Sequence, residues 1–372
     1  MPDTAGVHDQ LTARLAGHTQ AFEKLFAEYF ESLGGALDTP SFSRFTPECL
    51  HLLRELSLRG GKRIRVVILN EAARLVTDGP VPGLEQAALS LELLHSHGLI
   101  HDDLIDDSPT RRGGPSTYYA YRERFPGRPR TALGLTVLAG DLALALSLRV
   151  LLDAEAAPPV RQAMIEAQTR AAAETFLGQI IDLERDVTGG LPVVEVIDQV
   201  ADYKSARYSL LAPLRLGLLA AGAQPERHDR ELSRYARLVG ICAQMRDDYL
   251  DLFGDGEVMG KPTGTDIRDG KRSYVVTALL SSLDGQDGLD GLARAERAVL
   301  EAALGDPACT AGTIDTIREI AEARGVAGRL RARMRDHAEQ AALVAEGWRP
   351  RWRSEAVAFF ELLPHWSVER SH

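Results

Sequence analysis

Two short runs of aspartates carry the most informative chemistry in the sequence, because each contains the pattern Asp-Asp-x-x-Asp. The first run, DDLIDD, begins at Asp102, and the second, DDYLD, begins at Asp247. On a helix, residues four apart lie on the same face. Asp106 therefore lies beside Asp102, and Asp251 lies beside Asp247. Carboxylates placed this way repel one another, so the pattern predicts a bound cation, and Mg²⁺ prefers oxygen ligands from carboxylates and substrate phosphates.

A solvated acidic surface is the simpler explanation for one such run, because charge runs are usually solvated. Two runs of the same form, both next to apolar residues such as Ile100 and Phe253, favour metal binding instead. A helical bundle can direct carboxylates from facing helices toward one cavity. We therefore expect both runs to serve a magnesium site that binds a diphosphate.

Basic motifs supply candidate partners for a second diphosphate. The run GGKRIR begins at Gly60, and RRGG begins at Arg111. Glycines before a helix start let backbone N–H groups approach phosphate, and Lys62 and Arg65 are spaced to share one helix face. Arginine binds phosphate oxygens through a bidentate fork, which gives Arg111 and Arg112 the same role. Taken singly, a Gly-Gly-Lys motif is usually a solvated basic turn, and the Arg-Arg-Gly-Gly motif is also explained by a surface loop that neutralises nearby aspartates.

Helices must position these motifs, since apolar residues recur at helical spacing along most of the chain. One such stripe contains Ala87, Leu91 and Leu94, and strand-like alternation is almost absent. Turn-forming residues break the pattern at 78–83, 126–129, 188–192, 254–270 and 284–291. The sequence predicts an all-α, single-domain helical bundle around a central cavity. It divides into an N-terminal extension of residues 1–20 and a catalytic domain of residues 21–372.

Composition excludes several other classes of protein. A net charge of −10 argues against non-specific nucleic-acid binding, and three widely spaced cysteines indicate a reducing compartment. The N-terminus has no apolar core of a signal peptide. The apolar stretch 133–152 contains Asp141 and Arg149, so it predicts a buried core helix rather than a membrane span. A cytoplasmic protein without integral membrane contact is expected.

Together these motifs resemble the trans-isoprenyl diphosphate synthases. The resemblance rests on GGKRIR, LLHSHGLIHDDLIDD with RRG, and QMRDDYLD, which occur in the order of that family between Gly60 and Lys271. It also includes Gly178-Gln179 with Asp182. The resemblance implies the isoprenoid synthase fold, a homodimer and three Mg²⁺ ions per active site, with Mn²⁺ able to substitute.

The resemblance also assigns roles to individual residues. The implied metal ligands are Asp102, Asp106 and Asp247, assisted by Asp103, Asp248 and Asp251. The residues implied to hold the allylic diphosphate are Arg111, Lys204, Gln244 and Lys261, with Ser205 and Lys271 also in the substrate site. The residues implied to hold isopentenyl diphosphate are Lys62, Arg65, His95 and Arg112. The catalytic set is Asp102, Asp103, Asp106, Lys204, Asp247 and Asp248.

The implied reaction is ionisation of the allylic diphosphate, attack by the isopentenyl double bond and loss of a proton to the released diphosphate. The product is a longer all-trans prenyl diphosphate. In this family the residues one turn before the first aspartates set product length, and here they are His97 and Gly98. The absence of Phe or Tyr there favours C20, with C15 and C25 or longer open.

Three positions depart from the family pattern. Ser205 stands where threonine is common, Ala243 where phenylalanine is frequent, and residues 272–274 where threonine and proline are frequent. Two other functions remain open, a class I terpene cyclase and a non-catalytic partner subunit of a prenyl synthase. A cyclase needs one diphosphate site rather than two, and a non-catalytic subunit can lose its aspartates, so the intact motifs favour condensation.

Overall fold

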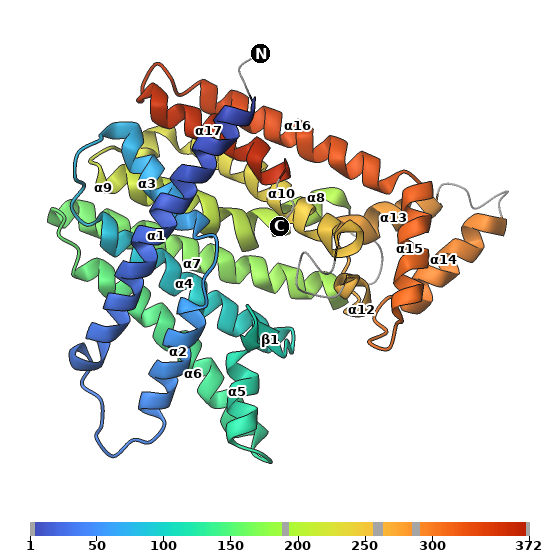
Figure 1. The fold of residues 1–372 in the computed structure, drawn as a ribbon, viewed down its shortest axis with the longest axis horizontal. Helices are drawn as coiled ribbons and strands as arrows, with labels where there is room; N and C mark the ends of the chain where they lie inside the picture. Colours follow the sequence, from blue (N-terminus) through green and yellow to red (C-terminus); the bar gives the residue numbers. More distant parts are fainter. Residues whose placement is uncertain (1–3, 188–192, 256–262, 285–290, 370–372) are drawn as a thin grey trace. The chain divides into compact units, whose positions relative to one another are not determined.

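The computed structural model describes residues 4–187, 193–255, 263–284 and 291–369. These residues are almost entirely helical, and a single short β-hairpin is the only sheet among them. The predicted all-α fold class is therefore confirmed. Figure 1 shows the helices in chain order. They form two compact units, one comprising residues 1–172 and 212–228, the other residues 173–211 and 229–372.

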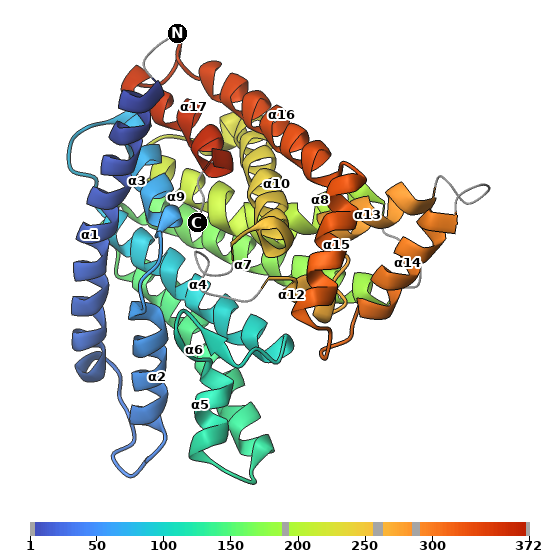
Figure 2. The ribbon, with the colours of Figure 1, turned by 45° about the vertical axis from the view of Figure 1, so that its right-hand side comes forward.

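The first unit is built around α3 and α4. Its elements are α1 (Thr4–Ala36), α2 (Thr46–Leu58), α3 (Ile64–Val76), α4 (Leu84–Ile105), β1 (Thr110–Arg111), β2 (Gly114–Pro115), α5 (Thr117–Arg124), α6 (Pro129–Leu152), the first part of α7 (Pro158–Val187), α9 (Ala212–Ala220) and the 3₁₀ helix η2 (Pro225–His228). Figure 2 shows α4 beside α6, and the two helices pack along much of their length. Gly217 permits the close packing of α9 on α3, because an added Cβ would lie 2.3 Å from the Leu69 carbonyl oxygen.

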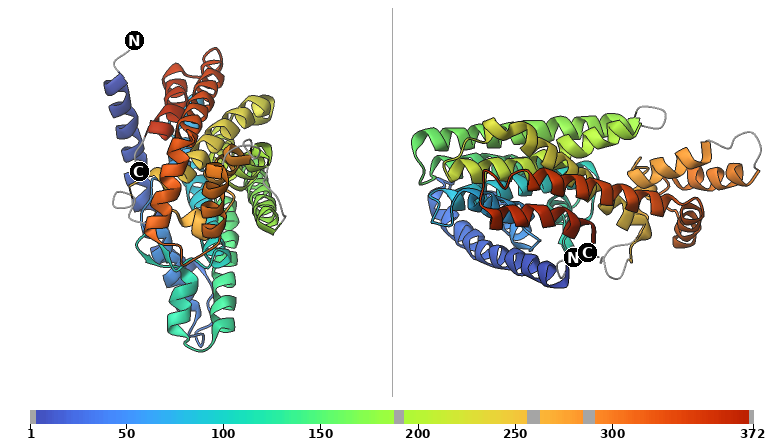
Figure 3. Two further views of the ribbon diagram at one scale, coloured as in Figure 1. Left: turned by 90° about the vertical axis from the view of Figure 1, so that its right-hand side faces the viewer. Right: turned by 90° about the horizontal axis from the view of Figure 1, so that it is seen from above.

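The second unit is built around α10. Its elements are the rest of α7, α8 (Val194–Val200), the π-helix η1 (Ala201–Leu211), α10 (Asp229–Phe253), α12 (Thr265–Arg268), α13 (Tyr274–Asp284), α14 (Gly291–Ala303), α15 (Ala311–Ala323), α16 (Val326–Glu346) and α17 (Ser354–Glu369). Figure 3 shows α16 and α17 side by side. The buried Trp348 contacts the rings of Tyr235 and Phe360, which links α10 to this pair.

Several boundaries bear on the sequence predictions. The break at 78–83 separates α3 from α4, and the break at 126–129 separates α5 from α6. The break at 254–270 contains the short helix α12, which the sequence did not indicate. Residue 20, the predicted end of an extension, lies within α1, where Leu11 and Leu15 are buried. The predicted break at 284–291 falls between α13, which ends at Asp284, and α14, which begins at Gly291. Its inner residues 285–290 and the break at 188–192 lie outside the described residues.

The helix α6 is the apolar stretch that the sequence assigned to the core. Residues 129–152 form a helix that is long and apolar enough to cross a membrane by length and composition alone. In the first unit this helix packs on α4 and α5, and Ala132, Ala139, Ala143 and Leu146 are buried. These contacts fit the predicted core helix, while Leu133 and Leu138 on its other face are exposed.

Candidate active site

The first aspartate run lies at the C-terminal end of α4. Asp102 and Asp103 are in the last turn, and Asp106 is the C-cap residue, whose N–H donates to the Asp102 carbonyl. The Asp102 side chain is 30% exposed, whereas the Asp103 side chain is 1% exposed. The run therefore presents Asp102 to solvent and turns Asp103 into the unit.

Arg111 is the ion-pair partner of Asp103. Its Nε donates to Asp103 Oδ1 over 2.8 Å, and its guanidinium lies 3.9 Å from Asp102 Oδ2. Burial raises the pKa of Asp103, and Arg111 opposes this shift. The second oxygen, Oδ2, is buried and accepts no hydrogen bond from any described residue. A buried carboxylate oxygen without a donor is costly, so this end of α4 fits the addition of a cation.

The β-hairpin after α4 positions both arginines of the RRGG motif. Strands β1 and β2 pair Arg111 with Gly114. The two loop residues, Arg112 and Gly113, have φ values of 50° and 75°, as in a type I′ turn. A left-handed conformation costs a non-glycine residue about 1–2 kcal/mol. Contacts of the Arg112 side chain offset this cost, because Nη1 donates to the Gly60 carbonyl over 2.6 Å and Nη2 lies 3.1 Å from Nε2 of His95.

Four arginines surround His95, and we call them the arginine cluster: Arg63, Arg65, Arg111 and Arg112. The pKa of His95 lies well below its usual value, first because the ring is buried and then because Arg65, Arg112, Arg63 and Arg111 repel the imidazolium form. The neutral ring accepts a hydrogen bond from Arg112. Burial also lowers the pKa of Arg112, and repulsion from the other three arginines adds to the shift. This concentration of positive charge favours an anion.

The turn before α3 brings the GGKRIR motif to the same place. Gly60 and Gly61 have φ values of 76° and 148°, which favour glycine. A Cβ on Gly61 would lie 3.2 Å from the guanidinium carbon of Arg112, so the backbone lies directly against that side chain. Lys62 is exposed beside the start of the helix. The N-terminus of α3 adds a favourable field for phosphate.

Two charged residues of this region were missed by the sequence analysis. Arg63 is buried with φ 44°, and it donates to Glu92, to Glu23 and to the Ser57 carbonyl. Glu92 is also buried and lies 3.8 Å from Arg65. These residues hold the turn and the start of α3 against α4. Arg63 belongs to the GGKRIR motif, but the sequence does not indicate that its side chain is buried, unlike the exposed side chain of Lys62.

Lys204 and Ser205 lie on the π-helix η1 in the second unit. The ammonium group of Lys204 donates to Asp182 on α7 over 2.7 Å. Gly178 makes this pairing possible, because an added Cβ would lie 2.3 Å from the Lys204 backbone nitrogen. On the other side, Gly240 of α10 lies against Ala206. A π-helix is rare and often marks a functional site, and here two glycines allow both neighbouring helices to touch it.

The second aspartate run lies at the end of α10, and its three aspartates have different surroundings. The Asp247 side chain is 66% exposed. Asp248 is buried and accepts hydrogen bonds from Gln244 and from the Tyr274 N–H. Asp251 is also buried and accepts from the N–H groups of Thr265 and Asp266 at the start of α12. Asp247 is therefore the aspartate of this run that is accessible to a cation from solvent.

The remaining predicted positions are placed as follows. Lys271 lies just before α13, with its ammonium nitrogen 3.8 Å from Asp269. Lys261 lies outside the described residues. His97 is buried, and its Nδ1 is 2.9 Å from the Gly140 carbonyl oxygen. A Cβ on Gly98 would meet nothing within 4 Å. The first run belongs to one unit and the second to the other, so a shared cavity stays a prediction.

Comparison with known proteins identifies the class. Residues 46–304 match the polyprenyl synthetase family, so the chain belongs to this family of prenyltransferases. Among curated relatives, a farnesyl diphosphate synthase of Geobacillus stearothermophilus is 34% identical over 270 residues, 70% of this chain and 82% of the relative. A geranylfarnesyl diphosphate synthase of Aeropyrum pernix is 31% identical over 242 residues, 63% and 69% of the two chains.

Solved structures agree. A geranylgeranyl pyrophosphate synthase of Corynebacterium glutamicum, complexed with isoprenyl diphosphate and magnesium, has a TM-score of 0.84 and 27% identity. The match covers 95% of this chain and 98% of that protein. The predicted family and enzyme class are thus confirmed. The relatives' names span several product lengths, so family membership alone leaves the product of this chain open.

Proposed function

We propose that this enzyme condenses isopentenyl diphosphate with an allylic diphosphate, head to tail, to give an all-trans prenyl diphosphate. The observation that carries the proposal is the arginine cluster around the neutral, buried His95. It offers a diphosphate site built from cationic side chains, in the same unit as the first aspartate run. A terpene cyclase requires only one diphosphate site. Two kinds of site, one acidic and one basic, therefore favour condensation.

The two runs of aspartates would hold the metal ions of the allylic diphosphate. Asp102, Asp106 and Asp247 are the proposed main ligands, and the buried, donor-free Oδ2 of Asp103 supports a cation at the end of α4. Bound Mg²⁺ supplies Lewis-acid stabilisation of the leaving diphosphate. We propose three such ions, with Mn²⁺ as a substitute. Asp103, Asp248 and Asp251 would assist by direct contact or through bound water, and the backbone hydrogen bonds that Asp248 and Asp251 accept would also position the motif.

In the proposed reaction the allylic C–O bond breaks and its electron pair remains on the diphosphate. Lys204, Arg111, Gln244, Lys261 and Lys271 would bind that diphosphate, and Ser205 would assist. The positive charges of Lys204 and Arg111 stabilise the negative charge as it develops. Isopentenyl diphosphate would be held by Lys62, Arg65, His95 and Arg112, and its double bond forms the new C–C bond. A proton then leaves the adjacent carbon for the released diphosphate, which restores a double bond.

We propose a C20 product. Gly98 leaves open space beside α4, and the medium-sized ring of His97 is buried one turn before Asp102. One helical turn rises about 5.4 Å, roughly the length of one isoprene unit. If His97 closes the cavity, His97→Ala will shift the main product to a longer chain by at least one unit. An unchanged product distribution would show that another residue limits the chain.

We further propose a cytoplasmic homodimer. The exposed apolar side chains of α6, Leu133, Val137 and Leu138, support contact between two copies. Light scattering of the purified protein tests this proposal, and a monomer at micromolar concentration would contradict it.

The deciding experiment supplies Mg²⁺, labelled isopentenyl diphosphate and the C5, C10 or C15 allylic diphosphate in separate reactions. Extended linear diphosphates support condensation, and chromatography then gives the chain length. A cyclic hydrocarbon formed from an allylic diphosphate alone would identify a cyclase. No product from any primer, with substrate binding retained, would identify a partner subunit. Asp102→Ala should abolish turnover, whereas Asp153→Ala, at an exposed aspartate after α6, should not.

A further inference from the structure

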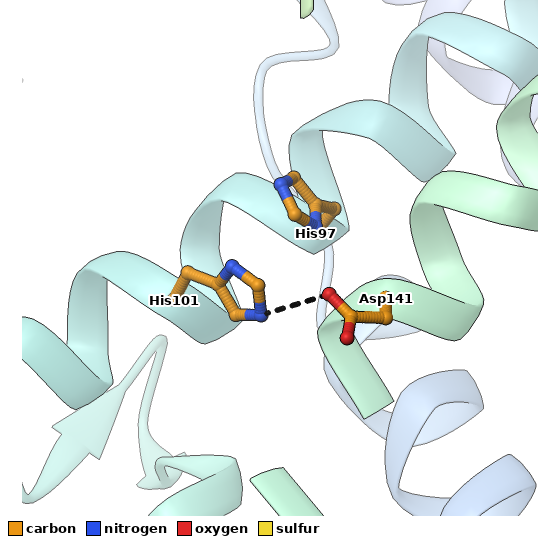
Figure 4. Close-up of side chains that lie close together, drawn as sticks. All are labelled: His97, His101 and Asp141. Atoms are coloured by element: carbon orange, nitrogen blue, oxygen red, sulfur yellow. Dashed lines mark ion pairs between the residues drawn. The ribbon is translucent and has the colours of Figure 1, made fainter. Parts of the chain in front are cut away.

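His97, His101 and Asp141 form a compact group between α4 and α6 in the first unit. Figure 4 shows the two histidines on successive turns of α4 and Asp141 opposite them on α6. One ring nitrogen of each histidine and one carboxylate oxygen lie within 4.8 Å of one another. Nε2 of His101 lies 3.8 Å from Asp141 Oδ1. The group uses none of the residues proposed to bind diphosphate.

The spacing along α4 places the two histidines together and separates them from the first aspartate run. Residues four apart share a helix face, and the ring centroids of His97 and His101 are 4.4 Å apart. The histidine face continues at Ile105, and Asp102 and Asp106 come one residue after His101 and Ile105. They are therefore turned by about 100° around the helix axis. The histidine face points to α6, where Asp141 supplies the third donor.

The backbone of α6 is adapted to the histidine rings. A Cβ on Gly140 would lie 2.3 Å from Nε2 of His101, so only glycine leaves room for the ring. The Gly140 carbonyl is 2.9 Å from Nδ1 of His97, and the Val137 carbonyl is 3.2 Å from Nε2 of His101. Metal-binding histidines commonly donate their other ring N–H to a backbone carbonyl, and Nδ1 of His97 does so here, whereas an ion on Nε2 of His101 would replace the contact with Val137.

Solvent reaches the group from one side. His97 is buried, while the side chains of His101 and Asp141 are 28% and 56% exposed. In a single chain an ion can therefore reach the group past Asp141, which shares a helix face with Val137 and Leu138, so in the proposed homodimer the site would lie beside the contact between the two copies. Around a tetrahedral Zn²⁺ with bonds of about 2.0–2.1 Å, donor atoms are roughly 3.4 Å apart. Donors within 4.8 Å reach that separation by small rotations of the exposed side chains.

We propose that His97, His101 and Asp141 bind one divalent transition-metal ion of the Zn²⁺ or Co²⁺ class. Two imidazoles and one carboxylate form a three-ligand set with an open position, typical of zinc and related ions. Mg²⁺ prefers oxygen ligands and near-octahedral geometry, so this site differs in metal preference from the aspartate runs. When the ion binds Nε2 of His101, the hydrogen bond from this nitrogen to the Val137 carbonyl is lost and the ring proton moves to Nδ1, so the ligand is a neutral imidazole.

Cobalt binding tests the proposal directly and does not depend on activity. The full-length protein, freed of metal by a chelator, is titrated with Co²⁺ in an excess of Mg²⁺ that occupies carboxylate sites. The visible spectrum is recorded, because Co²⁺ with nitrogen ligands and low coordination absorbs far more strongly than octahedral Co²⁺. The variants are Asp141→Asn, His101→Gln and Gly140→Ala. The controls are Asp153→Asn and the double variant Asp102→Asn with Asp247→Asn.

The wild-type protein and both controls should bind one Co²⁺ per chain with an intense visible band, and Zn²⁺ should displace it. Asp141→Asn and His101→Gln should weaken this binding at least tenfold, the order of loss expected when one metal ligand or its support is removed. Gly140→Ala should weaken it too, since the new methyl group displaces the His101 ring. Circular dichroism and light scattering confirm that each variant keeps its fold and assembly state.

A wild-type spectrum unchanged by Asp141→Asn and His101→Gln would overturn the proposal, as would loss of the band only in the double variant. Either result would mean that the three side chains do not form a metal site.

Discussion

Gly178→Ala tests whether close contact between α7 and the π-helix positions Lys204. The added Cβ would lie 2.3 Å from the Lys204 nitrogen and 2.6 Å from both the Lys204 Cα and the Tyr203 carbonyl carbon. Ordinary contacts begin near 3.4 Å, and all three neighbours are backbone atoms, so η1 must move by about 1 Å. Overpacking of this kind typically costs about 1–3 kcal/mol. For a unit of this size, the melting temperature should fall by roughly 3–9 °C.

The matched control is Gly328→Ala on α16 in the same unit. Nothing lies within 4 Å of a Cβ at this position, so the alanine should stabilise the helix by about 0.5–1 kcal/mol. Thermal unfolding followed by circular dichroism compares the two variants with the wild type. Because Lys204 moves with η1, Gly178→Ala should also lower turnover, whereas Gly328→Ala should not. Equal melting temperatures for the two variants would refute the argument that Gly178 allows close contact between α7 and η1.

The remaining predictions concern charge. Asp247→Asn should reduce turnover on the order of 10²-fold without changing the melting temperature. Asp251→Asn should lower the melting temperature, because it weakens two backbone hydrogen bonds worth about 1–3 kcal/mol. The reverse pattern would contradict these roles. Arg112→Ala should raise KM for isopentenyl diphosphate roughly tenfold or more and leave KM for the allylic diphosphate nearly unchanged. Steady-state kinetics measures both values, and the control Arg122→Ala should change neither. The pKa of His95 is lowered in the folded protein, so below about pH 6.5 the unfolded chain binds more protons than the folded chain, and stability decreases as the pH is lowered. His95→Gln should reduce this loss of stability, measured by denaturant titrations between pH 5 and 7. An unchanged dependence of the free energy of unfolding on pH would count against a buried neutral ring.

Helical periodicity predicted the elements that carry the site, because burial follows the same spacing. Ala87, Leu91 and Leu94, chosen from the sequence as one stripe, are all buried in α4. That choice also fixed where the first aspartates lie, since they continue the same helix by two turns. The turns that carry the basic motifs could also be predicted from the sequence, because each motif combines arginines with adjacent glycines, which are typical of turns.

Long-range partners were not predictable in this way. The π-helix η1 depends on Gly178 and Gly240, which are far from it in sequence and act by lacking a side chain. Glu92 lies within an apolar stretch, and only the structure reveals that it lies against Arg63 and Arg65. The left-handed conformation of Arg112 is likewise set by the hairpin and by its contacts with Gly60 and His95.

The different surroundings of the aspartates explain why their spacing alone overstated their similarity. The pattern Asp-Asp-x-x-Asp predicts one common role, yet in the second run only Asp247 is largely exposed, while Asp248 and Asp251 accept backbone N–H groups at the starts of α13 and α12. Those bonds stabilise the negative charge of both buried side chains, and they tie the segments that follow α10 to the aspartate run. A cation bound at Asp247 would therefore affect the position of the segment that contains Lys271. Asp248, the neighbour of Asp247, accepts a hydrogen bond from the Tyr274 N–H, and Tyr274 is only three residues after Lys271. If the proposed metal binding at this motif occurs, it would therefore be linked through Asp248 to the position of residues 272–274, which depart from the family pattern.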